Sequence, residues 1–125
     1  MSANGAFNEF AVAAGADLST QQYKCVTVSG TIASTPGNSI GVLINKPKSG
    51  EAARVAFQGH MKAIVGAAVT AADELVVTTS GYLITNATST SGIVGKALKS
   101  AASGALVEFV GNFANARTSY SIGIV

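Results

Sequence analysis

The chain carries an internal repeat of short strand-like segments and glycine turns, and this repeat restricts the possible folds more than any other feature. The glycines inside two matching apolar segments, Gly41 and Gly95, lie 54 positions apart. The glycines of the Ser-Gly turns that follow, Gly50 and Gly104, have the same spacing. Each copy therefore has the order strand, Ser-Gly turn, strand, Gly-containing strand, Ser-Gly turn, strand.

Upstream of these glycines, residues 26–32 resemble residues 77–83 at a spacing of 51, so a three-residue insertion separates the two matching blocks. We place the copies at about residues 23–60 and 74–111. Two copies are too few for a solenoid. They predict a small β-barrel or sandwich of two pseudo-repeated halves, in which each half covers the apolar face of the other.

Short segments rich in β-branched residues, each ending near Gly, Pro or Ser, recur at roughly 8–12-residue intervals. The expected strands are residues 24–29, 39–45, 52–57, 62–65, 75–79, 82–85, 93–98 and 106–110. Residues 79–82 are expected to form a tight hairpin turn. Helix is expected to be minor, so the sequence predicts an all-β fold.

The glycines have two expected roles. Those that follow serine are expected to adopt positive φ in turns: Gly30, Gly50, Gly81 and Gly104. Gly41 and Gly95 lie inside strands, where a missing side chain indicates a bulge or a close approach of two backbones. Phe57 and Phe109 occupy matching strand positions and are expected to lie in the core.

One domain is expected, with an extended segment at each end. The predicted divisions are an N-terminal arm at residues 1–22, a β-barrel domain at 23–111 and a C-terminal tail strand at 112–125. The arm is polar and Gly-rich, with Phe7 and Phe10 as candidate anchors on another molecule. The alternating apolar residues of the tail indicate a strand that needs a partner edge: Tyr120, Ile122 and Ile124. The alternative is that both ends pack on their own barrel.

Only 11% of the residues are charged, against about 25% in an ordinary soluble domain. The 48% of hydrophobic residues are mostly small, because aromatics make up 6% and tryptophan is absent. This composition excludes a disordered chain, and one cysteine excludes a disulfide scaffold. A net charge of +2 without clusters argues against nucleic acid, and no apolar stretch approaches the roughly 20 residues of a membrane span. A surface this poor in charge is expected to be covered by another molecule.

Residues that could support catalysis or hold a cofactor are few. His60 is the only histidine and has no carboxylate near it in sequence, so catalysis is disfavoured. Cys25 lies in a β-branched segment and is expected to be a small buried hydrophobe. The doublet of Asp73 and Glu74 is too small for a dedicated metal site, and the glycines before Lys96 lack the spacing of a phosphate-binding loop. We predict no catalytic, cofactor-binding or metal-binding residues.

Four blocks of the sequence resemble the head decoration, or capsid cement, proteins of tailed bacteriophages. The blocks are DLSTQQY at residues 17–23, IGVLINKP at 40–47 with SGEAARV at 49–55, residues 66–75, and residues 94–98 with 103–109. The resemblance covers residues 17–111 and rests on the order and spacing of the blocks. This sequence departs from the family at Ala72, where a glycine before the acidic residue is usual, and it has an extra C-terminal stretch at 112–125.

The resemblance implies a non-enzymatic β-barrel protein, without cofactors, that binds the exterior of an assembled capsid. Its implied partners are the major capsid protein and sister copies in a homo-oligomer, often a trimer. Its implied location is the virion exterior, with the host cytoplasm as its location during assembly. Such a protein bridges capsid subunits, and binding that favours the expanded lattice stabilises that lattice by linkage.

A free-standing β-barrel binding module, for glycans or for adhesion to a host surface, is the alternative function. Such a module is expected to carry aromatic platforms in a concave site. Three tyrosines and no tryptophan give this alternative little support.

Overall fold

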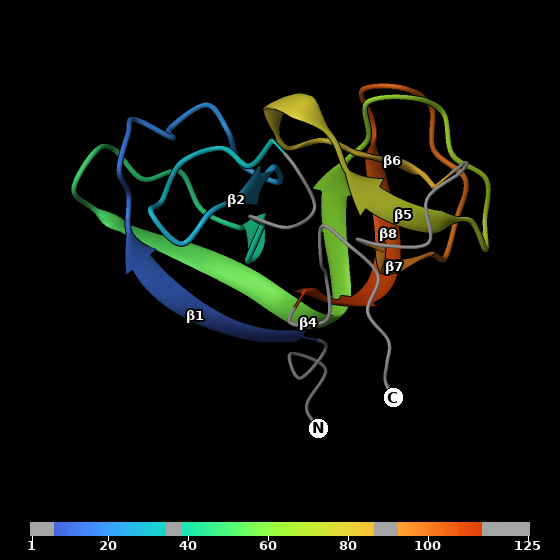
Figure 1. The fold of residues 1–125 in the computed structure, drawn as a ribbon, viewed down its shortest axis with the longest axis horizontal. Coiled ribbons are helices and arrows are strands. Elements are labelled where there is room, and N and C mark those ends of the chain that lie inside the picture. The colour runs from blue at the N-terminus through green and yellow to red at the C-terminus, as the bar shows by residue number, and fades with distance from the viewer. Residues whose placement is uncertain (1–6, 35–38, 87–92, 114–125) are drawn as a thin grey trace.

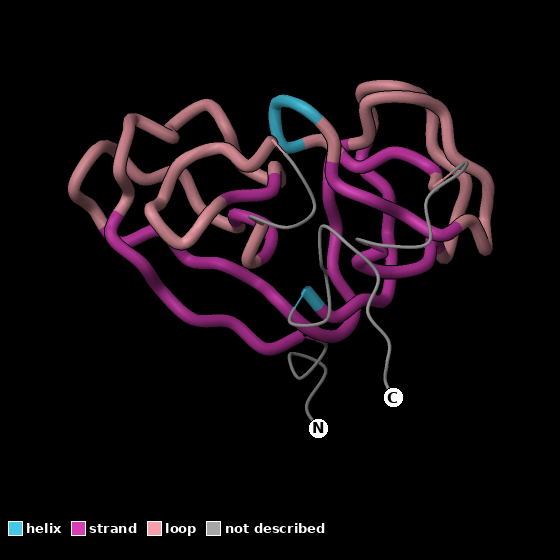
Figure 2. Tube along the Cα trace, in the orientation of Figure 1, coloured by secondary structure: helices cyan, strands magenta, loops and turns pink. Residues whose placement is uncertain are grey.

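The computed structural model describes residues 7–34, 39–86 and 93–113. Within these ranges the chain is almost entirely strand, turn and loop (Figures 1 and 2). The strands are β1 (Phe7–Ala13), β2 (Cys25–Val26), β3 (Gly41–Leu43), β4 (Ala52–Ile64), β5 (Glu74–Val77), β6 (Leu83–Thr85), β7 (Ile93–Ala97) and β8 (Leu106–Asn112). A 3₁₀ turn, η3 (Thr79–Gly81), closes the expected hairpin between β5 and β6.

The named strands pair antiparallel in one sheet, in the order β2-β3-β4-β8-β7-β5-β6, and β1 also pairs with β4. The sheet curls back on itself at both ends. At one end Gly15 N–H donates to the Gly30 carbonyl at 2.9 Å, and at the other Gly66 N–H donates to the Leu83 carbonyl at 2.9 Å. The predicted all-β, barrel-like fold is therefore confirmed.

β4 is one long strand where the sequence analysis expected two, at residues 52–57 and 62–65. Gly59 lies between these segments with a φ of 110°, a conformation that side chains rarely adopt. The glycine lets the strand turn without ending, so the two expected segments form one strand. Before the bend β4 pairs with β1 and β3, and after it with β8 (Figure 1).

β1 lies in the segment that the sequence analysis assigned to an arm. Its seven residues pair with residues 52–59 of β4 and add a strand to the sheet. A register shift between Asn8 and Glu9 interrupts the alternation of apolar and polar residues. Because of this irregularity, residues 7–13 lack the regular alternation from which a strand is predicted.

The hydrogen-bond pattern of the first half recurs in the second half. β3 pairs with β4, and 54 positions later β7 pairs with β8 in the same register. The matching pairs are Val42–Ala56 with Lys96–Val110, and Leu43–Val55 with Ala97–Phe109. Loop hydrogen bonds match as well: Ala14–Glu51 with Val65–Ala105, Leu18–Pro47 with Val69–Ala101, and Gly50–Ala14 with Gly104–Val65.

These matches extend the repeat beyond the expected copies, because they include residues on the N-terminal side of residue 23. We define the first unit as residues 7–57 and the second unit as residues 58–113, and we call matched residues counterparts. β1 opens the first unit, and the part of β4 after Gly59 opens the second. In the first unit, the opening strand β1 pairs with the closing strand, which is β4 before the bend. In the second unit, the part of β4 after the bend pairs with the closing strand β8.

The glycines inside the strands confirm the expected close approach. A side chain at Gly41 would overlap the carbonyl oxygen of Ala56, and one at Gly95 would overlap that of Val110, its counterpart. The four turn glycines have the expected positive φ: 75° at Gly30, 86° at Gly50, 76° at Gly81 and 85° at Gly104. The structure thus requires glycine at matching places in both units.

Each unit has an apolar interior, and a larger core also joins the two. The interior of the first unit consists of Ala14, Leu18, Val26, Leu43, Ala53 and Val55. The larger core contains the interior of the second unit, including Phe109, and four side chains of the first unit: Cys25, Ala33, Val42 and Ala56. We call this contact between the units the seam. Phe57 differs from expectation, because it is half-buried while Phe109 is fully buried, and Val55 is the counterpart of Phe109.

Candidate interaction surfaces

A pocket of about 420 Å³ opens at the seam, beside the bend of β4. Its basic side chains are the cations Arg54 and Lys62 and the imidazole of His60, and all three come from β4. Its other lining residues are mostly apolar or aromatic: Phe7, Tyr23, Ile44, Ala56 and Met61. Within the described residues, the ammonium group of Lys62 forms no ion pair. The pocket therefore combines an apolar wall with positive charge.

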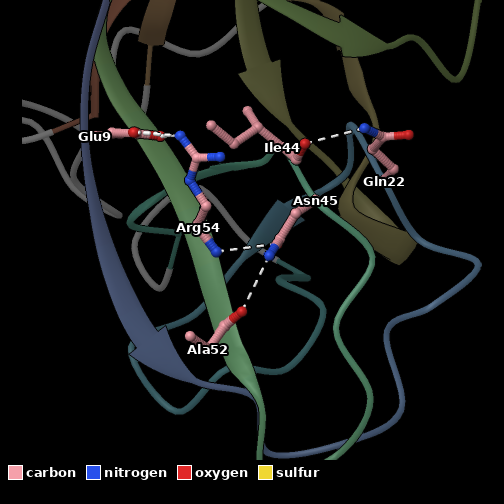
Figure 3. A network of polar contacts seen from close by, with 6 residues as sticks. All are labelled: Glu9, Gln22, Ile44, Asn45, Ala52 and Arg54. Atoms are coloured by element: carbon pink, nitrogen blue, oxygen red, sulfur yellow. Dashed lines mark hydrogen bonds and ion pairs between the residues drawn. The ribbon is translucent and has the colours of Figure 1, made fainter.

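Arg54 is held in place by a polar network on the first unit (Figure 3). Its Nη2 donates to Glu9 Oε1 at 2.8 Å, which ties β4 to β1. Its backbone N–H donates to Asn45 Oδ1 at 3.0 Å, and Asn45 Nδ2 donates to the Ala52 carbonyl at 3.0 Å. The hydrogen bond to Glu9 and the attraction of its charge raise the pKa of Arg54. The guanidinium is thus a fixed positive group at the edge of the pocket.

The second unit has a charge pair at the counterpart positions, with the signs exchanged. Glu108 is the counterpart of Arg54, and His60 stands on the opening strand as Glu9 does on β1. His60 Nε2 lies 3.1 Å from Glu108 Oε1, and Lys99 Nζ lies 3.5 Å from Glu108 Oε2. The hydrogen bond from His60 and the charge of Lys99 lower the pKa of Glu108. The fold thus brings to His60 a carboxylate that is distant in sequence, in an exposed cross-strand pair.

A second hollow, of about 350 Å³, lies beside Phe10 and is lined by four residues of the first unit and one of the second. Its lining residues are Phe10, Ser39, Ile40, Phe57 and Phe113. The rings of Phe10 and Phe57 meet edge to face with centroids 5.3 Å apart, a favourable geometry for aromatic pairs. Phe10 nevertheless remains 39% exposed, so this hollow presents an aromatic surface to solvent.

The other residues considered for chemistry have structural environments. Cys25 is fully buried, and burial raises the pKa of its thiol to about 12, so it is not a poised nucleophile. Asp73 accepts hydrogen bonds from Thr70 N–H and Thr85 Oγ1, each at 2.9 Å, and thereby fixes a turn. The described ranges contain no group of three His, Cys, Asp or Glu residues that could hold a metal ion. They also contain no helix long and apolar enough to cross a membrane.

The predicted interface residues fall in two separate places or outside the described chain. Phe7 lines the seam pocket, and Phe10 lines the second hollow, although both come from β1. Tyr120, Ile122 and Ile124 lie outside the described residues. Their role in an interface stays a prediction. Arg54 and Lys62 were not among the predicted site residues. They line one pocket with His60 only because β4 is a single continuous strand, which the sequence does not reveal.

The fold defines an all-β protein of two duplicated, curled units that share one long strand. No family model matches the chain, and no curated protein matches it. Among solved structures, the chain is similar to the head fiber gp8.5 N base of bacteriophage phi29, with a TM-score of 0.68 and 18% sequence identity. The match covers 93% of this chain and 99% of that chain. At this identity the likeness shows a shared fold.

Proposed function

We propose that this protein is a structural component of a tailed-phage virion, which decorates and stabilises the exterior of the capsid by bridging major capsid subunits. The observation that carries the proposal is the match of nearly the whole fold, over nearly the whole of both chains, to the base of a phage head fiber. The sequence resemblance to capsid decoration proteins points in the same direction and is independent of the fold. The proposed activity is binding, without catalysis.

We assign the capsid contact to the seam pocket. It is concave, it joins apolar lining to the charges of Arg54 and Lys62, and it lies where the two units meet. A surface of this chemistry fits a capsid segment that carries a carboxylate beside an apolar side chain. Such binding stabilises the capsid if the segment is better presented in the expanded lattice than before expansion.

Co-sedimentation with purified heads of the phage that encodes the protein tests the proposal. We expect saturable binding to heads lacking the protein and a higher temperature of DNA release once the heads are decorated. A Lys62→Glu variant is expected to bind at least roughly tenfold more weakly, because it reverses the charge at the pocket. Lys46→Glu is the matched control, because Lys46 is also exposed but lies outside the pocket lining.

Two outcomes contradict parts of this proposal. Absence of binding to heads, together with binding to cells or purified polysaccharide, would favour the adhesion module and reject the capsid role. Equal loss of binding in the Lys62→Glu and Lys46→Glu variants would reject the pocket as the contact while leaving the capsid role in place.

A deletion that tests whether the N-terminal residues contribute to capsid binding must end before Phe7, because β1 belongs to the sheet.

A further inference from the structure

Tyr23 has a backbone conformation that disfavours a residue of its size. Its φ is 71°, in the left-handed region that glycine adopts without steric cost. It occupies the third position of a four-residue turn, which the hydrogen bond from Lys24 N–H to the Gln21 carbonyl closes at 3.2 Å. A positive φ at this position is typical of a type II turn, for which glycine or asparagine is preferred. Strained residues of this kind cluster at binding and active sites, so the side chain of Tyr23 is a candidate for function.

The matching turn of the second unit shows that the fold does not require a tyrosine here. The counterpart of Tyr23 is Ala72, which has a φ of 77°, and the hydrogen bond from Asp73 N–H to the Thr70 carbonyl closes its turn at 3.0 Å. Ala72 is exposed and has only a methyl group as its side chain. Ser80, the other described non-glycine residue with positive φ, is also small. Among the described residues, Tyr23 is therefore the one large side chain held at positive φ.

The side chain of Tyr23 lines the seam pocket, and its backbone is fixed beside it. Its N–H donates to the Leu43 carbonyl at 2.7 Å, and its carbonyl accepts a hydrogen bond from Ile64 N–H at 3.0 Å. The second bond places Tyr23 beside β4, two residues from Lys62 on that strand. The ring is half-buried against the core that joins the two units. The backbone thus holds the ring at the wall of the pocket, next to the strand that carries the cations.

Two hydrogen-bond donors of the pocket lining are available to a ligand. The described residues provide no hydrogen-bond partner for the phenol hydroxyl of Tyr23. They also provide no ion-pair partner for the ammonium group of Lys62. The first donor is neutral and the second is charged, and both suit a carboxylate as acceptor.

The charges around the pocket favour a ligand with one carboxylate. Glu9 neutralises Arg54, and Glu108 lies 3.1 Å from the ring of His60. Within the described part of the chain, Lys62 therefore contributes the uncompensated positive charge of the pocket. A single carboxylate neutralises this charge, and the apolar wall of the pocket accommodates an apolar group beside the carboxylate.

We propose that Tyr23 anchors the ligand of the seam pocket. Its hydroxyl donates a hydrogen bond to the carboxylate that Lys62 attracts, and its ring covers the apolar group beside that carboxylate. The ligand class is an acidic group next to an aromatic or aliphatic one. Tyrosine suits both roles, because it offers a large contact area and a hydrogen-bond donor with few rotatable bonds to order. The proposal rests on the assignment of this pocket under the proposed function and names the residue that determines its specificity.

A small molecule tests the recognition without a capsid. The probe is 3-phenylpropionate, which joins one carboxylate to an aromatic ring. Titration followed by two-dimensional NMR should show saturable shifts of pocket amides, with a dissociation constant on the order of 1 mM. The uncharged 3-phenylpropionamide should bind at least roughly tenfold more weakly, because it lacks the charge that Lys62 attracts.

Tyr23→Phe separates recognition from packing, because it keeps the ring and removes the hydroxyl. We expect it to bind the probe roughly threefold to tenfold more weakly at an unchanged melting temperature. Tyr82→Phe is the matched control, because Tyr82 is also half-buried but lies outside the pocket lining. Equal binding of the probe by Tyr23→Phe and the wild-type chain, or no probe binding by the wild-type chain, would overturn the proposal.

Lys62→Gln tests whether the two donors share one carboxylate. If they do, the loss of probe affinity in the Tyr23→Phe, Lys62→Gln double variant should be smaller than the product of the two single losses, by about twofold or more. Losses that multiply would contradict the shared carboxylate.

Binding to purified heads connects the anchor to the capsid. Tyr23→Gly should bind heads at least roughly tenfold more weakly, because it removes the whole anchor. Ala72→Gly relieves the matching strain outside the pocket and should bind heads as the wild-type chain does. Equal head binding by Tyr23→Gly and the wild-type chain would overturn the anchor and leave the capsid role in place. Probe binding without head binding would reject the capsid role and leave the anchor in place.

Discussion

The two units share a backbone pattern but differ in how they fill and cover it. Inside the first unit, Leu43 lies opposite Val55, and at the counterpart positions of the second unit Ala97 lies opposite Phe109. In the first unit the larger residue of the pair is Leu43 on β3, and in the second unit it is Phe109 on β8. The interior is filled in both units, but from opposite strands of the pair. The outer faces differ as well, because only the first unit has its outer face covered by the other unit. Close packing thus preserves the strand register while the side chains diverge.

The largest effect is expected from truncating the large residue of each cross-strand pair. Phe109→Ala should lower the free energy of unfolding by about 3–5 kcal/mol and Leu43→Ala by about 2–5 kcal/mol, because both side chains are fully buried. Denaturant titration followed by circular dichroism measures both values. If the exchange of large residues is compensatory, Leu43→Phe should be poorly tolerated while Val55 remains. A stability loss below about 1 kcal/mol in Phe109→Ala would contradict the packing comparison.

The strand segments and turn glycines could be predicted because they depend on local preferences. The positive φ at Gly30, Gly50, Gly81 and Gly104 follows from turn chemistry. The joining of β4 across Gly59 could not be predicted, because only pairing with β1 and β8 keeps the residues on both sides extended. The same holds for the seam pocket, which exists only once residues 54–62 of β4 lie beside Tyr23 and Ile44. The exposed pair of His60 and Glu108 likewise depends on strand register.

The glycines inside the strands provide the next test of the equivalence between units. Gly41→Ala and Gly95→Ala should each lower stability by about 1–3 kcal/mol, because the added methyl group meets a backbone carbonyl of the paired strand. Gly104→Ala is the control, since no atom lies within 4 Å of its would-be side chain and only its φ of 85° opposes the change. Its expected cost is about 1 kcal/mol. Thermal unfolding measures the order of the three stability losses. If Gly95→Ala caused no loss of stability, the equivalence of Gly41 and Gly95 would be contradicted.

Ala72 and Tyr23 are counterparts that both have positive φ, at 77° and 71°. Their flanking hydrogen bonds match as well, because Ala72 N–H donates to Ala97 and Tyr23 N–H to Leu43. Ala72→Gly should raise stability by about 0.5–1 kcal/mol, because relief of the backbone strain exceeds the entropy that glycine gains in the unfolded chain. Tyr23→Gly relieves the same strain but also removes a side chain from the seam pocket, so it should not stabilise. Denaturation midpoints of both variants decide between these expectations.

The smallest effect concerns the cross-strand pairs of Glu9 with Arg54 and of His60 with Glu108, which occupy matching places in the two units with the acidic and basic residues exchanged. The pKa of Glu108 in the folded chain lies below its ordinary value near 4.5, chiefly because His60 donates a hydrogen bond to the carboxylate. The folded state therefore favours the ionised form. The resulting stability is fully present above the ordinary pKa and is lost as the pH falls through the lowered one.

Glu108→Gln should accordingly lower the melting temperature slightly at pH 7, and the difference from the wild-type chain should shrink as the pH falls below 4.5 and disappear once it is below the lowered pKa of Glu108. Glu9→Gln gives the comparison for the first unit, where the cation is an arginine that stays charged at every pH of the experiment. High salt should reduce both differences, because Glu108, Glu9 and their partners are solvated. A difference between the wild-type and Glu108→Gln chains that persists unchanged at low pH would mean that the side chain acts through packing and not through its charge.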